Sequence, residues 1–205
     1  MTTTLPRLAR RVNESCNVRV LDTLAMQGVA LAVWHRPPSP ALQSWLDGLP
    51  AERLPRMRRT IPAAQARLAV AAACERAETP PGRHRDDLLD QVAEMVGLAG
   101  EVLAAPLVEV RLDVTEGQTC PRWHFDAVRA RLLCTLRGPG TEFGPARPDG
   151  TAAAVYSVPT AAAGLFRGLL WPGSELSGIV HRSPPANGET RLLLVVDPVD
   201  DAGSC

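Results

Sequence analysis

The sequence predicts an α+β protein in which a mainly helical region, residues 1–100, precedes an antiparallel β-structure in residues 101–199 and a short tail in residues 200–205. Two observations predict this division. Apolar residues recur at helical spacing in three stretches before Gly100, whereas short β-like runs separated by Gly and Pro follow it. A length of 205 residues suits one integrated domain, so we expect the helices to pack on the outside of the β-structure.

Three stretches of the first half are predicted to be helices. Residues 41–49 follow Ser39-Pro40, which supplies a capping hydroxyl and a proline in the first turn. The Ala-rich residues 63–77 favour a second helix. Residues 86–98 carry a stripe of Leu, Val and Met at spacings of three and four, and Gly100 ends this helix.

Short β-like runs dominate the second half. The predicted strands are residues 107–114, 131–136, 153–158, 165–171 and 191–196. Turn residues separate them and no helical pattern intervenes, so we expect antiparallel pairing in a sandwich or small barrel of jelly-roll type.

The composition excludes several function classes. All 22 basic residues are Arg, and without any Lys the chain has no Schiff-base lysine, Walker A loop or pyridoxal phosphate site. Aromatic residues make up 4% and the formal charge is balanced, which argues against nucleic acid as a partner. No run of eighteen apolar residues predicts a membrane span, and the first residues do not resemble a secretory signal, so we expect a cytoplasmic protein.

Five cysteines do not predict a disulfide scaffold. Their number is odd, no CxxC spacing occurs, and the expected compartment is reducing. We expect most of them to be small buried residues and Cys205 to lie in the tail. Cys120 is different because it lies four residues before His124.

A candidate metal site is formed by His124, Asp126 and His181. His124 and Asp126 are two residues apart, and in an extended segment their side chains point to the same side. His181 lies ahead of the last predicted strand and can supply a third ligand. Two histidines and one carboxylate on a β-scaffold are the ligand set that holds non-haem Fe(II) and leaves positions open. The other two histidines, His35 and His84, have no such partner in the sequence.

Arg191, ten residues after His181, completes a pattern that resembles the Fe(II)/2-oxoglutarate-dependent dioxygenase superfamily. The resemblance covers about residues 107–198 and includes residues 168–173, which look like the strand and turn before the distal histidine. It implies a double-stranded β-helix, Fe(II) held by the HxD pair and the distal His, and 2-oxoglutarate whose far carboxylate meets the Arg. A guanidinium suits that role because it binds a carboxylate through two hydrogen bonds and keeps its charge.

Four strings resemble a narrower group, the bacterial domain-of-unknown-function family 1826. They are His124-Phe125-Asp126, Arg131-Leu132-Leu133-Cys134-Thr135, Gly138-Pro139-Gly140-Thr141-Glu142-Phe143 and His181-Arg182-Ser183-Pro184-Pro185. The Gly-Pro-Gly-Thr-Glu and His-Arg-Ser-Pro-Pro strings are the distinctive ones. This family has no established activity, so the resemblance implies a domain rather than a reaction.

Two functions from different classes follow. The first is an oxygenase that uses Fe(II) and 2-oxoglutarate to hydroxylate or otherwise oxidise an unknown small-molecule or peptide substrate. The second is a non-enzymatic zinc-binding or metal-handling protein in which Cys120 joins His124, Asp126 and His181, because a thiolate favours Zn(II). Further residues could line a pocket beside the site or pack structurally: Trp123, Arg131, Glu142, Trp171 and Arg182. The sequence does not fix the oligomeric state.

Overall fold

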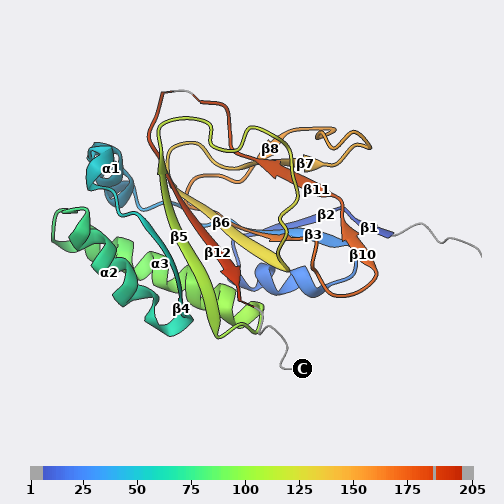
Figure 1. Cartoon of the computed structure of the whole chain (residues 1–205), viewed down its shortest axis with the longest axis horizontal. Coiled ribbons are helices and arrows are strands. Elements are labelled where there is room, and N and C mark those ends of the chain that lie inside the picture. Colours follow the sequence, from blue (N-terminus) through green and yellow to red (C-terminus); the bar gives the residue numbers. More distant parts are fainter. Residues whose placement is uncertain (1–6, 187, 200–205) are drawn as a thin grey trace, which may run out of the picture.

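The computed structural model describes residues 7–186 and 188–199. Its elements, in chain order, are β1 (Arg7–Ala9), β2 (Arg11–Ser15), the 3-10 helix η1 (Val18–Ala25), β3 (Val29–Trp34), α1 (Pro40–Gly48), η2 (Ala51–Arg53), β4 (Met57–Pro62), η3 (Ala63–Gln65), α2 (Ala66–Arg76), α3 (Arg83–Val102), β5 (Leu107–Thr115), β6 (Ala130–Arg137), β7 (Glu142–Pro145), β8 (Tyr156–Ser157), β9 (Ala163–Arg167), β10 (Glu175–Ser177), β11 (Ile179–Arg182) and β12 (Arg191–Pro198). The chain is a mixed α+β protein, as predicted, with one large sheet (Figure 1).

The large sheet has seven strands in the order β2-β3-β9-β6-β12-β5-β4. Its neighbouring strands are antiparallel except for β2 and β3, which are parallel. A smaller sheet has the order β11-β7-β8 and is antiparallel. A parallel pair, β1 and β10, extends one end of the molecule. The pairing is therefore mixed, and the two parallel pairs contain β1 and β2, the first two strands of the chain.

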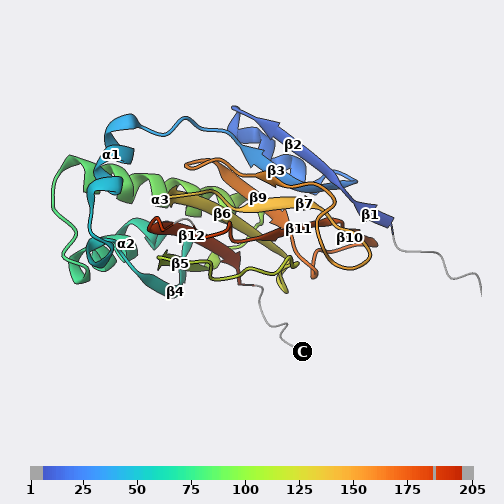
Figure 2. The ribbon, with the colours of Figure 1, turned by 90° about the horizontal axis from the view of Figure 1, so that it is seen from above.

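The two faces of the large sheet have different covers. Helices α1, α2 and α3 pack on one face, and the smaller sheet lies on the other side (Figures 1 and 2). Strand β12 shows how the sequence produces this, because alternate residues point to opposite faces. Leu192, Leu194 and Val196 belong to the helix-side core, whereas Leu193 and Val195 pack between the sheets.

The three predicted helices are present with shifted ends. Helix α1 covers the predicted helix except for its last residue, Leu49, and the Ser39 hydroxyl accepts a hydrogen bond from the backbone of Leu42 at 3.4 Å. The predicted 63–77 consists of η3 followed by α2, and the predicted 86–98 lies within the longer α3.

The predicted strands are confirmed at 107–114, 131–136 and 191–196. Two others are wrong in extent. The predicted 153–158 contains only the two-residue strand β8, and the predicted 165–171 leaves the sheet after Arg167. The turn begins at Gly168, where a Cβ atom would lie 1.9 Å from the carbonyl oxygen of Val128. The backbone of Gly168 lies in close contact with the segment that carries Asp126. The N–H of Leu169 is bonded to the carbonyl of Asp126 in that segment, and the chain turns away from the sheet there.

The first hundred residues also supply strands, which corrects the prediction that the β-structure starts at residue 101. Strands β2, β3 and β4 belong to the large sheet. Strand β3 is a continuous apolar run that is buried on both faces, and such a run has no period that separates a strand from a helix. Strand β4 lies at the sheet edge and has four exposed residues, so it lacks an apolar pattern.

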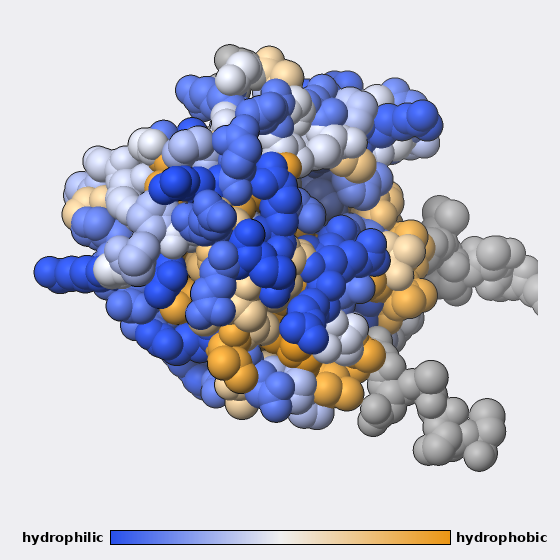
Figure 3. All heavy atoms as spheres, turned by 60° about the vertical axis from the view of Figure 1, so that its left-hand side comes forward, coloured by the Kyte–Doolittle hydropathy of each residue, from blue (hydrophilic) through white to orange (hydrophobic). Residues whose placement is uncertain are grey.

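The surface on the side of α1 and α2, brought forward in Figure 3, is largely hydrophilic. In residues 7–186 and 188–199, no helix is both long and apolar enough to cross a membrane.

The four cysteines among the described residues are free thiols: Cys16, Cys74, Cys120 and Cys134. The predicted tail cysteine, Cys205, lies outside the described residues.

Candidate metal centre

A cavity of about 200 Å³ lies between the two sheets and contains most of the predicted site residues. The large sheet contributes strands β5, β6 and β12, and the opposite wall comes from β11 and the segment before β6. Its lining residues are Arg111, Asp113, Thr119, Cys120, His124, Arg131, Leu133, Thr141, His181, Arg182, Ser183, Arg191, Leu193 and Val195. Histidine, carboxylate and arginine side chains that are far apart in the sequence therefore share one space.

His124 and His181 are brought together by their backbones. The segment that carries His124 pairs with β11 through two reciprocal hydrogen bonds of 3.1 Å, each from one histidine N–H to the carbonyl of the other. The two imidazole rings consequently stack at an angle, with centroids 4.5 Å apart. His181 is buried and His124 is one-third exposed at its side chain.

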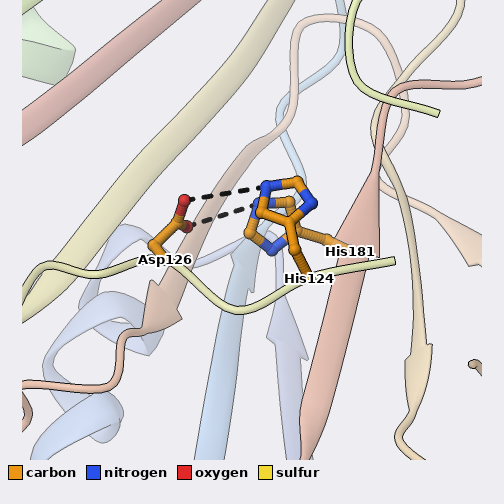
Figure 4. A group of neighbouring side chains, drawn as sticks. All are labelled: His124, Asp126 and His181. Carbon is orange, nitrogen blue, oxygen red and sulfur yellow. Dashed lines mark ion pairs between the residues drawn. The ribbon is translucent and has the colours of Figure 1, made fainter. Parts of the chain in front are cut away.

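Asp126 is held from behind by the turn that follows β9. The N–H of Leu169 donates to the carbonyl of Asp126 at 2.8 Å, and Gly168 allows the close approach of the two segments. The carboxylate is buried and points toward both imidazoles (Figure 4). Asp126 Oδ2 lies 3.3 Å from Nε2 of His181, and Asp126 Oδ1 lies 3.9 Å from Nε2 of His124. One possible ligand atom from each of the three residues lies within 4.8 Å of the others.

Both histidines can offer an unprotonated nitrogen. Burial lowers the pKa of His181 to about 3, and the nearby His124 and Arg131 act in the same direction, so His181 is neutral at pH 7. Nδ1 of His124 lies 3.0 Å from the carbonyl oxygen of Arg122. Because a carbonyl only accepts, this contact places the proton on Nδ1 and leaves the Nε2 lone pair for the site.

The carboxylate of Asp126 has one oxygen without a hydrogen bond. Burial raises the pKa of Asp126, and the charge of Arg131 opposes this effect. Oδ1 accepts a hydrogen bond from Nη1 of Arg131, whereas Oδ2 is buried and has no hydrogen-bond partner among the described residues. A buried acceptor without a donor is costly, and a cation held between Oδ2 and the two histidine nitrogens would satisfy it. The donor set therefore fits a divalent metal ion.

Cys120 is beside the three residues but not among them. Its Sγ lies 3.7 Å from Nδ1 and 3.9 Å from Nε2 of His124, and the side chain is exposed. The group of close ligand atoms contains His124, Asp126 and His181 without Cys120. The geometry thus gives three converging donors, with the thiol at the rim of the cavity.

Arg191 reaches the same cavity from the start of β12. Its Nε donates to the carbonyl of Pro139 at 2.9 Å, and its Nη2 donates to the hydroxyls of Thr135 at 3.1 Å and Thr141 at 2.9 Å. Among the described residues, no carboxylate lies within the ion-pair distance of 4.0 Å, and none accepts a hydrogen bond from Nη1. Burial lowers the pKa of Arg191 to about 10. The side chain is a buried cation held by neutral acceptors.

The loop that holds Arg191 is the Gly-Pro-Gly-Thr string. Gly138 has a φ of +81°, and a Cβ there would lie 2.9 Å from the carbonyl oxygen of Thr190. At Gly140 a Cβ would lie 1.8 Å from the carbonyl oxygen of Val158. Glycine is therefore required at both positions for the loop to close on Arg191.

The remaining predicted pocket residues have mixed outcomes. Arg182 lines the cavity, pairs with Glu142 at 2.8 Å and stacks on the Trp123 ring with its guanidinium carbon 4.4 Å from the centroid. Glu142 and Trp123 thus orient Arg182 rather than line the cavity. Of the two alternatives left open for Trp171, the structure shows packing: the residue lies against the helix-side core, with the Arg167 guanidinium over its ring.

Arg131 lines the cavity and is paired on both sides. It contacts Asp126 through Nη1, and its Nε and Nη2 donate to the two carboxylate oxygens of Asp197 at 2.6 and 2.8 Å. No role was predicted for Asp197, Thr135 or Thr141. A signal for Asp197 exists, since it is an acidic residue in an apolar strand at an even spacing from Arg191.

A family profile described as "Protein of unknown function (DUF1826)" matches residues 15–197. The chain belongs to this family. The resemblance drawn from the Gly-Pro-Gly-Thr-Glu and His-Arg-Ser-Pro-Pro strings is thereby confirmed. No curated protein matches the sequence.

Solved structures of dioxygenases resemble the chain in fold. The dioxygenase for auxin oxidation 1 from Arabidopsis thaliana, in a binary complex with 2-oxoglutarate, has a TM-score of 0.56 at 10% identity, over 93% of this chain and 92% of that one. The dioxygenase for auxin oxidation in rice has a TM-score of 0.54 at 17% identity, over 94% of this chain and 84% of that one. At such low identity these likenesses show a shared fold.

Proposed function

We propose that the protein is a non-haem Fe(II)/2-oxoglutarate-dependent oxygenase whose two facing sheets form a double-stranded β-helix of jelly-roll type. One observation carries the proposal. Oδ2 of Asp126, which is buried and accepts no hydrogen bond, faces the imidazoles of His124 and His181 beside the cavity that Arg191 lines, and among the described residues Arg191 is a buried cation with no carboxylate within 4.0 Å. A metal ion would give the buried carboxylate of Asp126 a positive partner, and a dicarboxylate bound at the metal ion would give the guanidinium of Arg191 a negative one.

His124, Asp126 and His181 would hold the metal ion. Three protein donors leave further positions for other ligands, which is the arrangement of non-haem iron oxygenases. When bound, iron and 2-oxoglutarate supply the oxidising chemistry, and the protein supplies binding, orientation and exclusion of water.

Arg191 would bind the far carboxylate of 2-oxoglutarate. Pro139, Thr135 and Thr141 fix the guanidinium through Nε and Nη2, and Nη1 is available to the ligand. The apolar side chains of Leu193 and Val195 line the cavity between Arg191 and the metal ligands and would exclude water there. Because a salt bridge gains strength when water is excluded, this wall supports the binding of an anion.

The second candidate is a zinc-binding or metal-handling protein without enzymatic activity. The position of Cys120 favours it, because a rotation of this exposed side chain could bring Sγ into the space beside His124. A thiolate as fourth donor would fill a position that an oxygenase needs open, and it would favour Zn(II) over Fe(II).

The proposed substrate is a small molecule or a peptide, and we propose neither nucleic acid nor a membrane as a partner. The auxin named for the two dioxygenases is not assigned to this chain, because the identities are 10% and 17%. We further propose a cytoplasmic location, which rests on the sequence alone.

Metal analysis and ligand binding test the proposal together. The protein is purified without oxygen and without chelators, its metal content is measured, and the Mn(II) form is then melted with and without 2-oxoglutarate. We expect about one equivalent of iron and a rise in Tm with millimolar 2-oxoglutarate, since the ligand binds only the folded state. Zinc together with an unchanged Tm would support the zinc-binding protein, and absence of any bound metal would contradict both functions.

A further inference from the structure

Beside the proposed metal ligands lies a buried charge network of three residues, Asp126, Arg131 and Asp197. Arg131 is on β6, Asp197 is near the end of β12, and Asp126 is in the loop before β6. The side chain of Arg131 is 19% exposed, that of Asp197 is 8% exposed and that of Asp126 is 2% exposed. Arg131 uses both edges of its guanidinium, one toward Asp126 and the other in a bidentate contact with Asp197. The network therefore ties the candidate metal ligand to the central strands of the large sheet.

We propose that Arg131 and Asp197 are positioning residues for Asp126 as a metal ligand. The inference rests on the proposed function. Arg131 donates a hydrogen bond to Oδ1 of Asp126, which also lies 3.9 Å from Nε2 of His124, so Oδ2 is the carboxylate oxygen that remains without a hydrogen bond, 3.3 Å from Nε2 of His181. Asp197 fixes the plane of the guanidinium through two hydrogen bonds.

Asp197 also has an electrostatic role. A guanidinium in contact with Asp126 offsets the one negative charge that a metal ion would meet there, because a histidine binds a metal ion as an uncharged ligand. With Asp197 present, the network holds two carboxylates and one guanidinium and keeps one negative charge beside the site. Arg111 is farther away, with Nη2 3.8 Å from Asp197, and it also faces Glu109 and Asp113. Asp197 thus allows Arg131 to hold Asp126 without neutralising the metal site.

This role differs from a structural ion pair in its consequences. Removal of a purely structural pair lowers stability and leaves the metal affinity of the folded protein unchanged. Removal of a positioning group around a metal ligand typically lowers metal affinity about 10- to 100-fold. The chain offers a matched control in Arg167–Glu175, a second ion pair with a buried arginine, at 3.2 Å, which does not line the cavity.

The experiment measures Mn(II) binding to the whole chain by electron paramagnetic resonance of the free ion. Asp197→Asn keeps the size of the side chain and removes its charge, and Glu175→Gln does the same at the control pair. We expect Asp197→Asn to bind Mn(II) at least about tenfold more weakly than wild type and Glu175→Gln to bind within about twofold of it. Equal affinity of Asp197→Asn and wild type would overturn the inference and leave the metal centre intact, whereas wild type that binds no Mn(II) would overturn the proposed function as well.

A second variant separates charge from position. Arg131→Met with Asp197→Leu removes one positive and one negative group, so the net charge beside the site is unchanged, and the apolar replacements lessen the risk of unfolding. If Arg131 restricts Asp126 to one oxygen, the visible absorption of bound Co(II) should differ from wild type, because Oδ1 becomes free to bind. An unchanged Co(II) spectrum in this variant would overturn the positioning role of Arg131.

Discussion

The two faces of the seven-stranded sheet use the same strands for different purposes. On strand β12 the helix side carries Leu192, Leu194 and Val196, all buried in the main core. The opposite side carries Arg191 and Asp197 at its ends with Leu193 between them. Because side chains alternate along a strand, a single segment can support the fold with one set of residues and build a cavity with the other. Residues that pack the main core and residues that face the cavity therefore alternate along β12.

The largest effect is expected from loss of a proposed metal ligand. His181→Ala should abolish metal retention, because two donors are too few to hold a divalent ion in the cavity. His84→Ala is the matched control, since His84 lies beside Asp87 and outside the cavity. Metal content after desalting checks this prediction, and full retention by His181→Ala would remove the residue from the site.

Neighbouring leucines on β12 test the separation of the faces directly. Leu194→Ala, on the helix side, should lower the free energy of unfolding by about 2–5 kcal/mol because it leaves a cavity in the main core, and its affinity for Mn(II) should not change. Leu193→Ala should lower the free energy of unfolding by less, because Leu193 is half-buried. It should nevertheless reduce the increase in that free energy that 2-oxoglutarate binding gives. Urea unfolding with and without ligand measures both, and equal profiles for the two variants would contradict the separation.

Arg191 tests the anion end of the cavity. In the Mn(II) form, wild type should gain about 2.7 kcal/mol at a 2-oxoglutarate concentration 100 times the Kd. Arg191→Gln should lose most of this gain, and Arg191→Lys should keep a part because the charge remains without bidentate geometry. Arg147, an exposed residue on a distant loop, supplies the control Arg147→Gln. The Tm shift is the measurement, and an undiminished shift in Arg191→Gln would place the ligand elsewhere.

Cys120 should give the smallest effect if the site has three protein donors. Cys120→Ser should leave Fe(II) and Mn(II) affinity within about twofold and lower zinc affinity only if the thiolate binds zinc. Competitive titration of the three metals measures this. A large loss of zinc affinity would favour the metal-handling function over the oxygenase.

The sequence predicted the helix cores and the central strands, because their apolar periods reflect burial on one side. It missed β3, since an entirely apolar run has no period, and β4, since an edge strand with exposed arginines has no apolar pattern. The parallel pairing of β2 with β3 depends on contacts between distant segments and leaves no local signal.

The site was predictable where chemistry restricts the residue types. Histidine, aspartate and arginine in the order His124, Asp126, His181 and Arg191 point to one centre, and in the structure both histidines and Arg191 line one cavity, with the Asp126 carboxylate 3.3 Å from His181. The network of Arg131 with Asp197 was not predictable, because these residues meet through strand pairing between β6 and β12. The packing of Trp171 against the helix-side core was not predictable either, because the alternation of a strand ends at Arg167, four residues before it.

The reciprocal backbone bonds between His124 and His181 have a consequence for the assembly of the centre. His124 lies in a segment without a strand of its own, and it gains its place only when β11, far along the chain, is already beside it. Asp126 depends in turn on the turn after β9, whose Leu169 N–H donates to its carbonyl. The three proposed metal donors therefore come together only when β11 and the turn after β9 both lie against the segment before β6, and a bound metal ion would in return hold these segments together.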